Sequence, residues 1–351
     1  MNILLDDIPY NNALYPFAAA RSMVHIRCGI LTILEKWELA FPGKIIISSE
    51  AYEKELAPVD YLKIPANIIP SANYLKQISE TQKDAGNKED SKILEHPWQI
   101  FEFNDWAIRE DFKSIAGIRS SEKISEGNQS VCPEKIFIES GAKINFCVLN
   151  AEAGPIYIGK NTEILEGCLI RGPFAICEGS KLKMGTKIYG ATTIGPHCIG
   201  GGEIKNSVMM AYSNKSHDGY LGDSVIGEWC NLGAGTSNSN LKNTAGMTRV
   251  WNKEKSRYVD AGTKCGLLMG DYSRCAINTS FNTGTVVGVC CNIFGNSFPP
   301  KYIRDFSWGN ENYIFEKAIR DIENWKKLKG FSVTDAEIKS LKKIYELKQN
   351  K

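Results

Sequence analysis

The sequence lacks any long apolar run and any strong excess of charge of one sign. No stretch approaches the ~18 consecutive apolar residues that a membrane-spanning helix requires. The first seven residues, M-N-I-L-L-D-D, lack the basic start and apolar core of a secretory signal peptide. The formal net charge of +2 over 351 residues gives no reason to expect a nucleic-acid or acidic-membrane partner. We therefore expect a cytoplasmic protein that binds neither nucleic acid nor membranes.

Closely spaced cysteine pairs are also missing. The chain has eleven cysteines, but they are scattered, with no C-x-x-C and a single adjacent pair, Cys290-Cys291. Zinc ligands normally come in closely spaced pairs, and disulfide frameworks belong to short secreted chains. We interpret these cysteines as small, reduced packing residues and predict no structural metal site.

An apolar residue recurs at every sixth position through the second half of the chain. From Ile136 the composition shifts to Ile, Val, Gly, Cys and Asn, with few helix-forming residues. Each six-residue unit then fits one short strand and a turn, and stacked coils bury the recurring side chains in one continuous core. This apolar ladder consists of Ile158, Ile164, Ile170, Ile176, Leu182, Ile188 and Ile194, then Ile226 and Leu232, and then Met269, Cys275, Phe281, Val287 and Ile293.

The repeat loses its register at two places. One lies between Gly200 and Glu203, and the other runs from about Asn238 to Gly262. We expect loops to leave the stack at both. After the Phe298-Pro299-Pro300 stretch the repeat ends, and residues 315–325 and 334–345 predict two amphipathic helices that cap or pack against the last coil.

The first third of the chain has a different pattern. Asn2–Leu5 and Lys44–Ser48 read as buried strands on either side of a helix around Ile30–Trp37, and Asn67–Ile69 reads as a third strand. A strand–helix–strand start implies a small parallel sheet. Residues 79–91 predict a polar surface loop, and 98–115 predict a helix that docks this domain onto the repeat.

These patterns predict a mixed α/β N-terminal domain followed by a parallel β-helix with C-terminal α-helices. The expected boundaries are 1–116 for the first domain, 117–135 for a connector, 136–298 for the β-helix and 299–351 for the helical tail.

A polar segment, Tyr212–Thr236, interrupts the ladder and contains His217. Histidine titrates near neutrality and can take a proton from an amine or hydroxyl nucleophile. His217 lies outside the ladder, so its pattern leaves two readings open: a general base, or a surface histidine that bonds its own loop. Of the other histidines, His25 and His96 have no acid or nucleophile motif nearby, and His197 follows the Ile194-Gly195-Pro196 turn and is interpreted as structural.

Two motifs in this segment resemble a known family. Residues 216–223, S-H-D-G-Y-L-G-D, and residues 231–236, N-L-G-A-G-T, are similar to the acetyltransferase domain of the bifunctional glucosamine-1-phosphate N-acetyltransferase/N-acetylglucosamine-1-phosphate uridyltransferase family. Ser216 replaces the glycine of that family's motif. The resemblance covers about residues 136–298. It implies a left-handed parallel β-helix built from hexapeptide repeats, a homotrimer with substrate clefts between neighbours, and acetyl-CoA as cosubstrate.

The resemblance also implies roles for individual residues. His217 falls at the position of the general base that deprotonates the amine of an amino-sugar phosphate. Tyr220 and Asn231 fall at sugar-binding positions. Lys205 and, with a weaker match, Lys183 fall at basic positions that hold the sugar phosphate, whose charge requires fixed cations.

Two further positions concern the acetyl group. Ala234 falls where a backbone N–H meets the acetyl carbonyl, and Asn240 matches an asparagine near it. The sequence departs from the family after this point. Leu241 stands where an aromatic residue is expected, and Asp271 is the nearest candidate for a downstream serine that contacts CoA.

The N-terminal domain has a separate resemblance. L-L-D-D at 4–7, followed by L-Y-P-F-A-A-A-R at 14–21, is similar to the divergent sugar nucleotidyltransferase domain fused to such acetyltransferases. Ordinary members have a glycine-rich loop whose amides cradle the nucleoside triphosphate, but here that place reads I-P-Y-N-N-A-L-Y-P. Mg²⁺ is expected only if this domain is active. Arg21 and Arg27 then either meet phosphate or form structural ion pairs.

We therefore predict a transferase of UDP-N-acetylglucosamine biosynthesis, which supplies the cell envelope, acting by N-acetylation of glucosamine-1-phosphate or a related amino-sugar phosphate. Two rival interpretations stay open. One is a sugar-1-phosphate nucleotidyltransferase, uridylyl or thymidylyl, in which the β-helix mainly oligomerises the chain. The other is a non-catalytic β-helical scaffold. The histidine motif favours the first prediction, and the missing glycine-rich loop argues against the nucleotidyltransferase.

Overall fold

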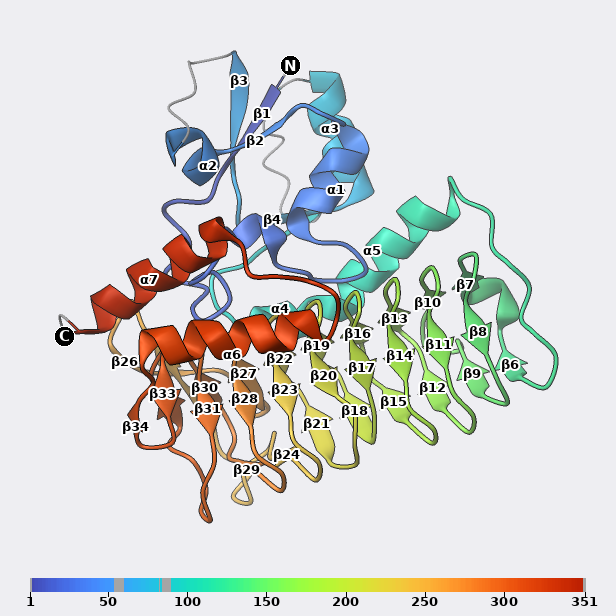
Figure 1. Ribbon diagram of the computed structural model, residues 1–351. Helices are drawn as coiled ribbons and strands as arrows, with labels where there is room; N and C mark the ends of the chain where they lie inside the picture. Colours follow the sequence, from blue (N-terminus) through green and yellow to red (C-terminus); the bar gives the residue numbers. More distant parts are fainter. Residues whose placement is uncertain (1, 54–59, 82, 84–89, 350–351) are drawn as a thin grey trace.

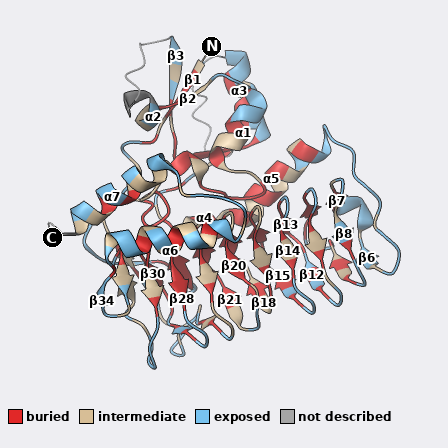
Figure 2. Ribbon diagram, viewed as in Figure 1, coloured by how far each residue is buried: buried red, intermediate tan, exposed pale blue. Residues whose placement is uncertain are grey.

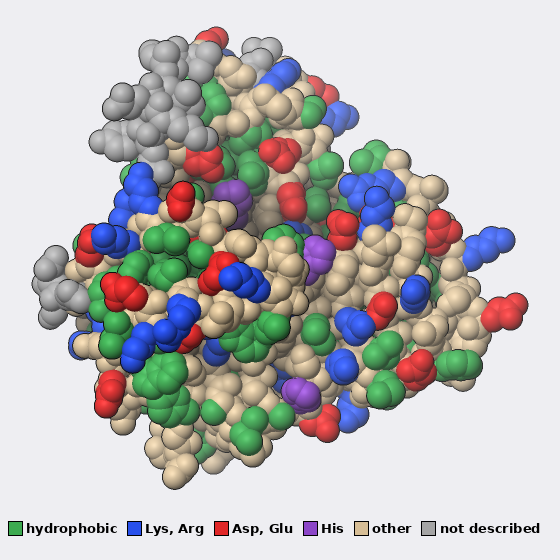
Figure 3. All heavy atoms as spheres, viewed as in Figure 1, with side chains coloured by type: hydrophobic (Ala, Val, Ile, Leu, Met, Phe, Trp, Pro, Cys, Tyr) green, Lys and Arg blue, Asp and Glu red, His purple; other side chains and the backbone are tan. Residues whose placement is uncertain are grey.

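The computed structural model describes residues 2–53, 60–81, 83 and 90–349. A small α/β domain lies on one side of a long β-solenoid, and two C-terminal helices run along the solenoid (Figure 1). Side chains of both charge signs are interspersed over the face shown in Figure 3. None of the helices in the described ranges combines the length and the apolar character that a membrane crossing demands.

The N-terminal domain is built on a three-stranded parallel sheet of order β2-β1-β3, with β1 (Asn2–Asp6) in the middle. The predicted first strand, helix and second strand are confirmed as β1, α1 (Ile33–Ala40) and β2 (Ile45–Ile47). The third strand of the sheet is β3 (Tyr61–Pro65), which was not predicted. Exposed and more buried residues alternate along this strand, so the sequence shows no continuous apolar run there. Helix α2 (Ser48–Glu53) follows β2 directly.

The strand expected at 67–69 forms, but in another place. It is β4 (Ile68–Pro70), which pairs antiparallel with β5 (Ser91–Ile93), apart from the parallel sheet. Helix α3 (Ala72–Thr81) occupies the start of the expected polar loop at 79–91. Most of the rest of that loop lies outside the described residues.

The predicted docking helix forms as two consecutive helices, α4 (Gln99–Glu102) and α5 (Asn104–Ala116). Their contact with the solenoid includes polar groups as well as apolar ones. The Asn104 side-chain amide donates to the backbone oxygen of Ala191 at 2.9 Å, and its oxygen accepts from the Thr193 hydroxyl at 3.1 Å. Asn104 is fully buried, so these bonds satisfy an amide that would otherwise be costly to bury.

The second part of the chain is a β-solenoid of about ten turns, built from three parallel sheets. The nine-stranded sheet contains β7 (Ile136–Ile138), β10 (Ile156–Ile158), β13 (Phe174–Ile176), β16 (Thr192–Ile194), β19 (Val208–Met209), β22 (Val225–Ile226), β27 (Leu267–Met269), β30 (Thr285–Val287) and β32 (Tyr302–Ile303). The outer side of this sheet packs against the N-terminal domain.

Two further sheets complete the solenoid. The ten-stranded sheet contains β8 (Lys143–Ile144), β11 (Glu163–Ile164), β14 (Lys181–Leu182), β17 (Ile199–Gly200), β20 (Asn214–Lys215), β23 (Asn231–Leu232), β28 (Arg274–Cys275), β31 (Asn292–Ile293), β33 (Ser307–Trp308) and the antiparallel β34 (Glu311–Asn312). The six-stranded sheet contains β6 (Gln129–Val131), β9 (Val148–Asn150), β12 (Leu169–Arg171), β15 (Lys187–Tyr189), β18 (Glu203–Lys205) and β21 (Tyr220–Gly222). Two short strands, β24 (Ser237–Asn238) and β29 (Ser280–Phe281), pair beside it.

The apolar ladder is confirmed as the solenoid core. All of its residues belong to one buried cluster, with exposures from 0% to 6% (Figure 2). In register, Ile158 pairs with Ile176 and Ile176 pairs with Ile194, so each side chain stacks on its equivalent in the next coil. The eleven cysteines are all free thiols, and all except Cys132 are buried, which agrees with a packing role.

The two register breaks have different causes. The later one is a true excursion that contains the hairpin of β25 (Arg249–Asn252) and β26 (Arg257–Asp260). The earlier one is not a loop, as had been expected, but a shortened corner between β17 and β18. A Cβ on Gly201 would lie 2.4 Å from the Ser216 oxygen, and Gly202 has φ +71°, so both positions require glycine.

The strands of the solenoid extend on both sides of 136–298. Within the expected connector, β6 pairs with β9, and beyond Pro300 β32 pairs with β30. The predicted C-terminal helices are confirmed as α6 (Phe315–Lys327) and α7 (Asp335–Gln349).

These helices do not sit only on the last coil. Ala318 and Ile322 of α6 are buried in one cluster with Trp229 and Phe306, which belong to well-separated coils. The helices therefore brace one corner of the solenoid along several turns (Figure 1).

Candidate functional site

His217 lies at the corner between β20 of the ten-stranded sheet and β21 of the six-stranded sheet. Its side chain is exposed and makes no hydrogen bond or ion pair within the described residues. The imidazole is therefore open to a ligand from outside, and no carboxylate of the described residues orients it.

A buried lysine, which the sequence analysis did not single out, holds the backbone of His217 from inside the solenoid core. Lys215 takes a ladder position, in register with Gly200 on the preceding coil, and only 2% of its surface is exposed. Its ammonium group donates to the backbone oxygen of His217 at 2.6 Å and to that of Gly201 at 3.1 Å. Burial lowers the pKa of Lys215 to about 8. The absent side chain of Gly200 leaves room for a long residue inside the core.

Tyr220 and Asn240 come together beside this corner. The Asn240 amide donates to the Tyr220 hydroxyl at 3.1 Å and also to the buried carboxylate of Asp223. Asn206 donates to the other oxygen of Asp223 at 2.6 Å. Burial, reinforced by the charge of Asp223, raises the pKa of Tyr220, so its hydroxyl stays protonated. Asp223 thus anchors two asparagines and, through Asn240, orients the tyrosine.

Lys205 lies on the same outer face, one coil away. It is in register with Gly222 on β21 and with Tyr189 on β15, and its Nζ lies 6.0 Å from the centre of the Tyr189 ring. The Tyr189 hydroxyl donates to Glu203, which raises the pKa of Tyr189 to about 12. The ammonium group of Lys205 makes no hydrogen bond or ion pair within the described part of the chain, and Glu203 is engaged by the tyrosine instead.

The remaining predicted residues lie around the corner rather than inside one cluster. Ala234 is at the same corner on the next coil, where the Gly235 N–H donates to the Asp218 oxygen at 3.1 Å. The Ala234 N–H itself donates no hydrogen bond among the described residues. Asn231 lies on the ten-stranded sheet, paired with Asn214, and is separated from Tyr220 by the corner. Lys183 is exposed and lies two coils away from His217.

Asp271 is not near this corner. It is 2% exposed and lies at a different corner of the solenoid, between β27 and β28, where it binds Arg21 of the N-terminal domain at 2.8 Å. The suggestion that it contacts CoA is therefore wrong, because no ligand reaches a buried, ion-paired carboxylate.

Comparisons with known proteins agree with both halves of the architecture. Residues 2–90 match the sugar nucleotidyl transferase family. The bifunctional protein GlmU of Methanocaldococcus jannaschii is 34% identical over 117 residues, which cover 33% of this chain and 28% of that protein. A bifunctional sugar-1-phosphate nucleotidylyltransferase/acetyltransferase of Sulfurisphaera tokodaii is 30% identical over 200 residues, 56% of this chain and 43% of that one.

Both parts of the chain are thus similar to bifunctional GlmU-like proteins, which join a sugar nucleotidyltransferase domain to a β-solenoid acetyltransferase-like region. A GlmU from Methanococcus maripaludis matches over 80% of the chain at 26% identity and extends the likeness across both domains. This GlmU-like chain spans between about a quarter and two thirds of the length of these relatives. A solved UDP-N-acetylglucosamine acyltransferase of Francisella novicida is 17% identical over 65% of this chain and 78% of its own, with a TM-score of 0.27, and adds nothing to the assignment.

In this GlmU-like chain, the carboxyl end of the small parallel sheet carries Asp6 and Asp7. This is the edge where open α/β sheets bind ligands. Asp7 is fully buried and accepts hydrogen bonds from Ser48 and Ser49 at 2.8 and 2.6 Å. Burial opposes its ionisation, but hydrogen bonds from Ser22, Ser49 and Ser48 outweigh that effect and lower its pKa. Its oxygens are therefore already satisfied by the protein, which does not fit a magnesium ligand.

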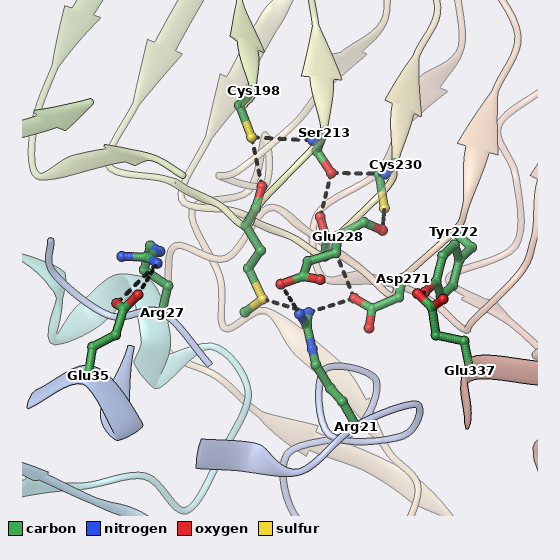
Figure 4. Close-up of polar contacts among 12 residues, drawn as sticks. Arg21, Arg27, Glu35, Cys198, Ser213, Glu228, Cys230, Asp271, Tyr272 and Glu337 are labelled. Atoms are coloured by element: carbon green, nitrogen blue, oxygen red, sulfur yellow. Dashed lines mark hydrogen bonds and ion pairs between the residues drawn. The ribbon is translucent and has the colours of Figure 1, made fainter. Parts of the chain in front are cut away.

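The loop that follows β1 is fixed against the solenoid (Figure 4). Arg21 forms ion pairs with Glu228 and Asp271, which lie on successive coils, and Arg27 forms one with Glu35. Both arginines are thus structural. Burial raises the pKa of Asp271 to about 6 even though Arg21 counteracts it. The loop after β1 therefore clamps the N-terminal domain to the solenoid through Arg21.

Proposed function

We propose that this GlmU-like chain transfers an acetyl group from acetyl-CoA to the amine of glucosamine-1-phosphate or a related amino-sugar phosphate at the His217 corner. The observation that carries the proposal is the pairing of two free groups on adjacent coils. The exposed His217 imidazole offers a base, and the unbonded Ala234 N–H offers a hydrogen-bond donor.

The chemistry follows from these groups. The neutral amine attacks the thioester carbonyl while His217 accepts the proton that the amine loses. The carbonyl oxygen becomes negative in the tetrahedral intermediate, and the Ala234 N–H stabilises it. The C–S bond then breaks, and the departing CoA thiolate takes a proton to leave as a thiol. The products are the N-acetylated sugar phosphate and CoA.

The surroundings of the corner provide for the rest of the substrate. Lys205, whose ammonium group has no hydrogen bond or ion pair among the described residues, would hold the phosphate. Tyr220 and Asn240, oriented by Asp223, provide polar groups for sugar hydroxyls. Asn231 lies on the other side of the corner and would serve this site only if a second copy of the chain packs there.

The surface around the corner supports such an assembly. Met184 and Ile277 occupy corner positions equivalent to that of His217 on other coils, and they are 67% and 68% exposed. Apolar side chains on both sides of a polar site suit an interface between copies. We infer a homotrimer whose clefts lie between neighbours.

The direct test incubates the purified chain with acetyl-CoA and a panel of amino-sugar phosphates and records free thiol. Release that depends on one amino sugar in wild type and is lost in His217→Ala supports the proposal. His197→Ala is the matched control, because His197 stacks on Tyr212 at a different corner. Failure of every amino-sugar phosphate to release thiol from a folded protein would refute it.

A second candidate is sugar-1-phosphate nucleotidyl transfer by the N-terminal domain, which the family match at 2–90 favours. The clamped loop and the buried Asp7 argue against it. We propose it only as a weak activity.

A further inference from the structure

A cleft of about 670 Å³ lies far from the His217 corner, where four segments meet. The loop after β1 and the β25–β26 hairpin form two of its sides. The last coil, around β32, and the end of α7 form the others. This volume is within the usual range for a site that holds a small molecule.

One wall of the cleft is aromatic. Trp251 of the hairpin stacks on Tyr302 of the last coil, with ring centres 4.8 Å apart and an interplanar angle of 17°. Tyr15, from the loop after β1, meets Tyr302 edge-on at 6.4 Å. Trp251 and Tyr302 both stay partly exposed. A flat ring gains stacking energy on a surface of this kind.

The cleft also has more cationic groups than it can neutralise. Asp305 accepts the Tyr15 hydroxyl and the Val289 N–H at 2.8 Å each, and its second oxygen binds Lys253 at 3.0 Å. Both oxygens of the carboxylate therefore have partners within the protein. Arg304, which precedes Asp305 in the chain, is exposed, and its guanidinium makes no hydrogen bond or ion pair in the described ranges.

A second cation lies close to Arg304. Lys348 of α7 donates to the Phe306 oxygen at 2.7 Å. Burial lowers the pKa of Lys348; the nearby charge of Asp305 partly opposes this, and the positive charge of Arg304 adds a smaller lowering effect. Glu254, the other acidic residue lining the cleft, is exposed on the hairpin and pairs with neither cation. Two like charges side by side with no bound carboxylate make a site for an anion.

We propose that this cleft binds a nucleoside phosphate, with the base against Trp251 and Tyr302 and the phosphate between Arg304 and Lys348. Simple domain packing would explain the aromatic stack but not an unpaired guanidinium beside a second cation. The same chemistry is present in a free nucleotide and in the adenosine diphosphate part of CoA. The proposal does not depend on acetyl transfer at His217, because the two sites lie at different corners of the solenoid.

Calorimetric titration of the full chain tests the proposal, with ADP, UDP, CoA, adenosine and inorganic phosphate as separate probes. We expect ADP to bind more tightly than either adenosine or phosphate alone. Arg304→Ala should weaken ADP binding about tenfold or more and leave adenosine binding unchanged. Trp251→Leu should weaken both. Arg257→Ala removes an exposed arginine from the same hairpin outside the cleft and should bind ADP as wild type does.

The outcomes separate the possible sources and can overturn the idea. CoA binding with the same sensitivity to Arg304→Ala identifies CoA as the source, whereas ADP or UDP binding without CoA binding identifies a free nucleotide. The proposal is overturned if no nucleotide binds at millimolar concentration, if phosphate binds as tightly as ADP, or if Arg304→Ala binds ADP like wild type. Unchanged ADP binding in His217→Ala confirms that the sites are separate, and weakened binding contradicts this.

Discussion

The ammonium nitrogen of Lys215 lies 2.6 Å from the backbone oxygen of His217, so a residue of the solenoid core fixes the corner that carries the proposed base. A lysine at a ladder position is costly, since burial disfavours its charged form. The position next to Gly200 makes it possible, because the neighbouring coil contributes no side chain there. The same stack of coils thus forms the apolar core and holds the corner that carries His217.

Lys215 should give stability a specific pH dependence. Its folded-state pKa is lowered to about 8, below the ordinary 10.5. Between these values the unfolded chain binds more protons at this position than the folded chain, so the free energy of unfolding rises with pH from about 8 to about 10.5. The free energy of unfolding in urea should be measured against pH for wild type and for Lys215→Met. The difference between the two should rise by up to about 3 kcal/mol over this range. Lys187→Met, which removes an exposed lysine, is the control. If the free energy of unfolding of Lys215→Met rose with pH as steeply as that of wild type, the lowered pKa would not belong to Lys215.

Arg21→Ala should destabilise the chain by about 3 kcal/mol, because it leaves the buried carboxylate of Asp271 without its partner. The double variant Arg21→Met/Asp271→Asn should recover part of the loss, since the unpaired charge is gone. Arg119→Ala, which removes a half-exposed ion pair with Glu139, should cost less than about 1 kcal/mol. Urea unfolding measures all three. Equal losses for Arg21→Ala and Arg119→Ala would show that the clamp contributes no more than a surface pair.

Nucleotidyl transfer should be weak or absent. The loop after β1 has no glycine to approach a triphosphate, and Arg21 is already paired. Pyrophosphate release from UTP or dTTP with Mg²⁺ and a sugar-1-phosphate measures the activity, and an active nucleotidyltransferase in the same assay sets the detection limit. Robust release would mean that the domain holds the nucleotide in another way, and Asp6, Asp7 and Arg21 would then be the first residues to mutate.

Sedimentation should give a trimer at micromolar concentration. Met184→Glu together with Ile277→Glu should shift it toward monomer, because both side chains are exposed at the corner that carries His217, two coils away on either side. Leu328→Glu alters a side chain that is 79% exposed just beyond α6 and should stay trimeric. A monomeric wild type would count against both the assembly and a site shared between copies.

The sequence predicted the solenoid core well because burial there depends on one periodic feature. Every ladder residue is buried, since each faces inward at the same point of its coil. The missed strand β3 has an alternating and partly exposed pattern, which single-sequence periodicity does not separate from a loop. The register break after Gly200 was interpreted as a loop, but it is a shortened corner. A pair of glycines is compatible with either a longer loop or a shorter corner, so the sequence alone does not distinguish them.

The site was predictable only in part. The motif residues His217, Tyr220 and Asn240 lie near one corner, and the roles that the resemblance implies for them stay predictions. Lys215 was missed because only apolar residues were counted as members of the ladder. A lysine at a ladder position therefore looks like an interruption of the repeat. The Asp271 assignment failed because its partner, Arg21, lies in the other domain, and pairing across such a distance leaves no local signal.

Kinetics of the two lysines and of His217 would separate binding from chemistry at the proposed site. His217→Ala should lower kcat for acetyl transfer by about 10²–10⁴-fold, the usual scale for a positioned base, with little change in KM. Lys205→Ala should instead raise KM for the phosphate-bearing substrate more than it lowers kcat, because it removes a contact made equally in the ground and transition states. Lys183→Ala is the matched control. The Lys183 side chain is exposed two coils from His217. If Lys183→Ala raises KM less than Lys205→Ala does, Lys205 is the main phosphate contact. If His217→Ala stays folded and trimeric yet acetylates at the wild-type rate, the base lies elsewhere and the corner is a structural turn.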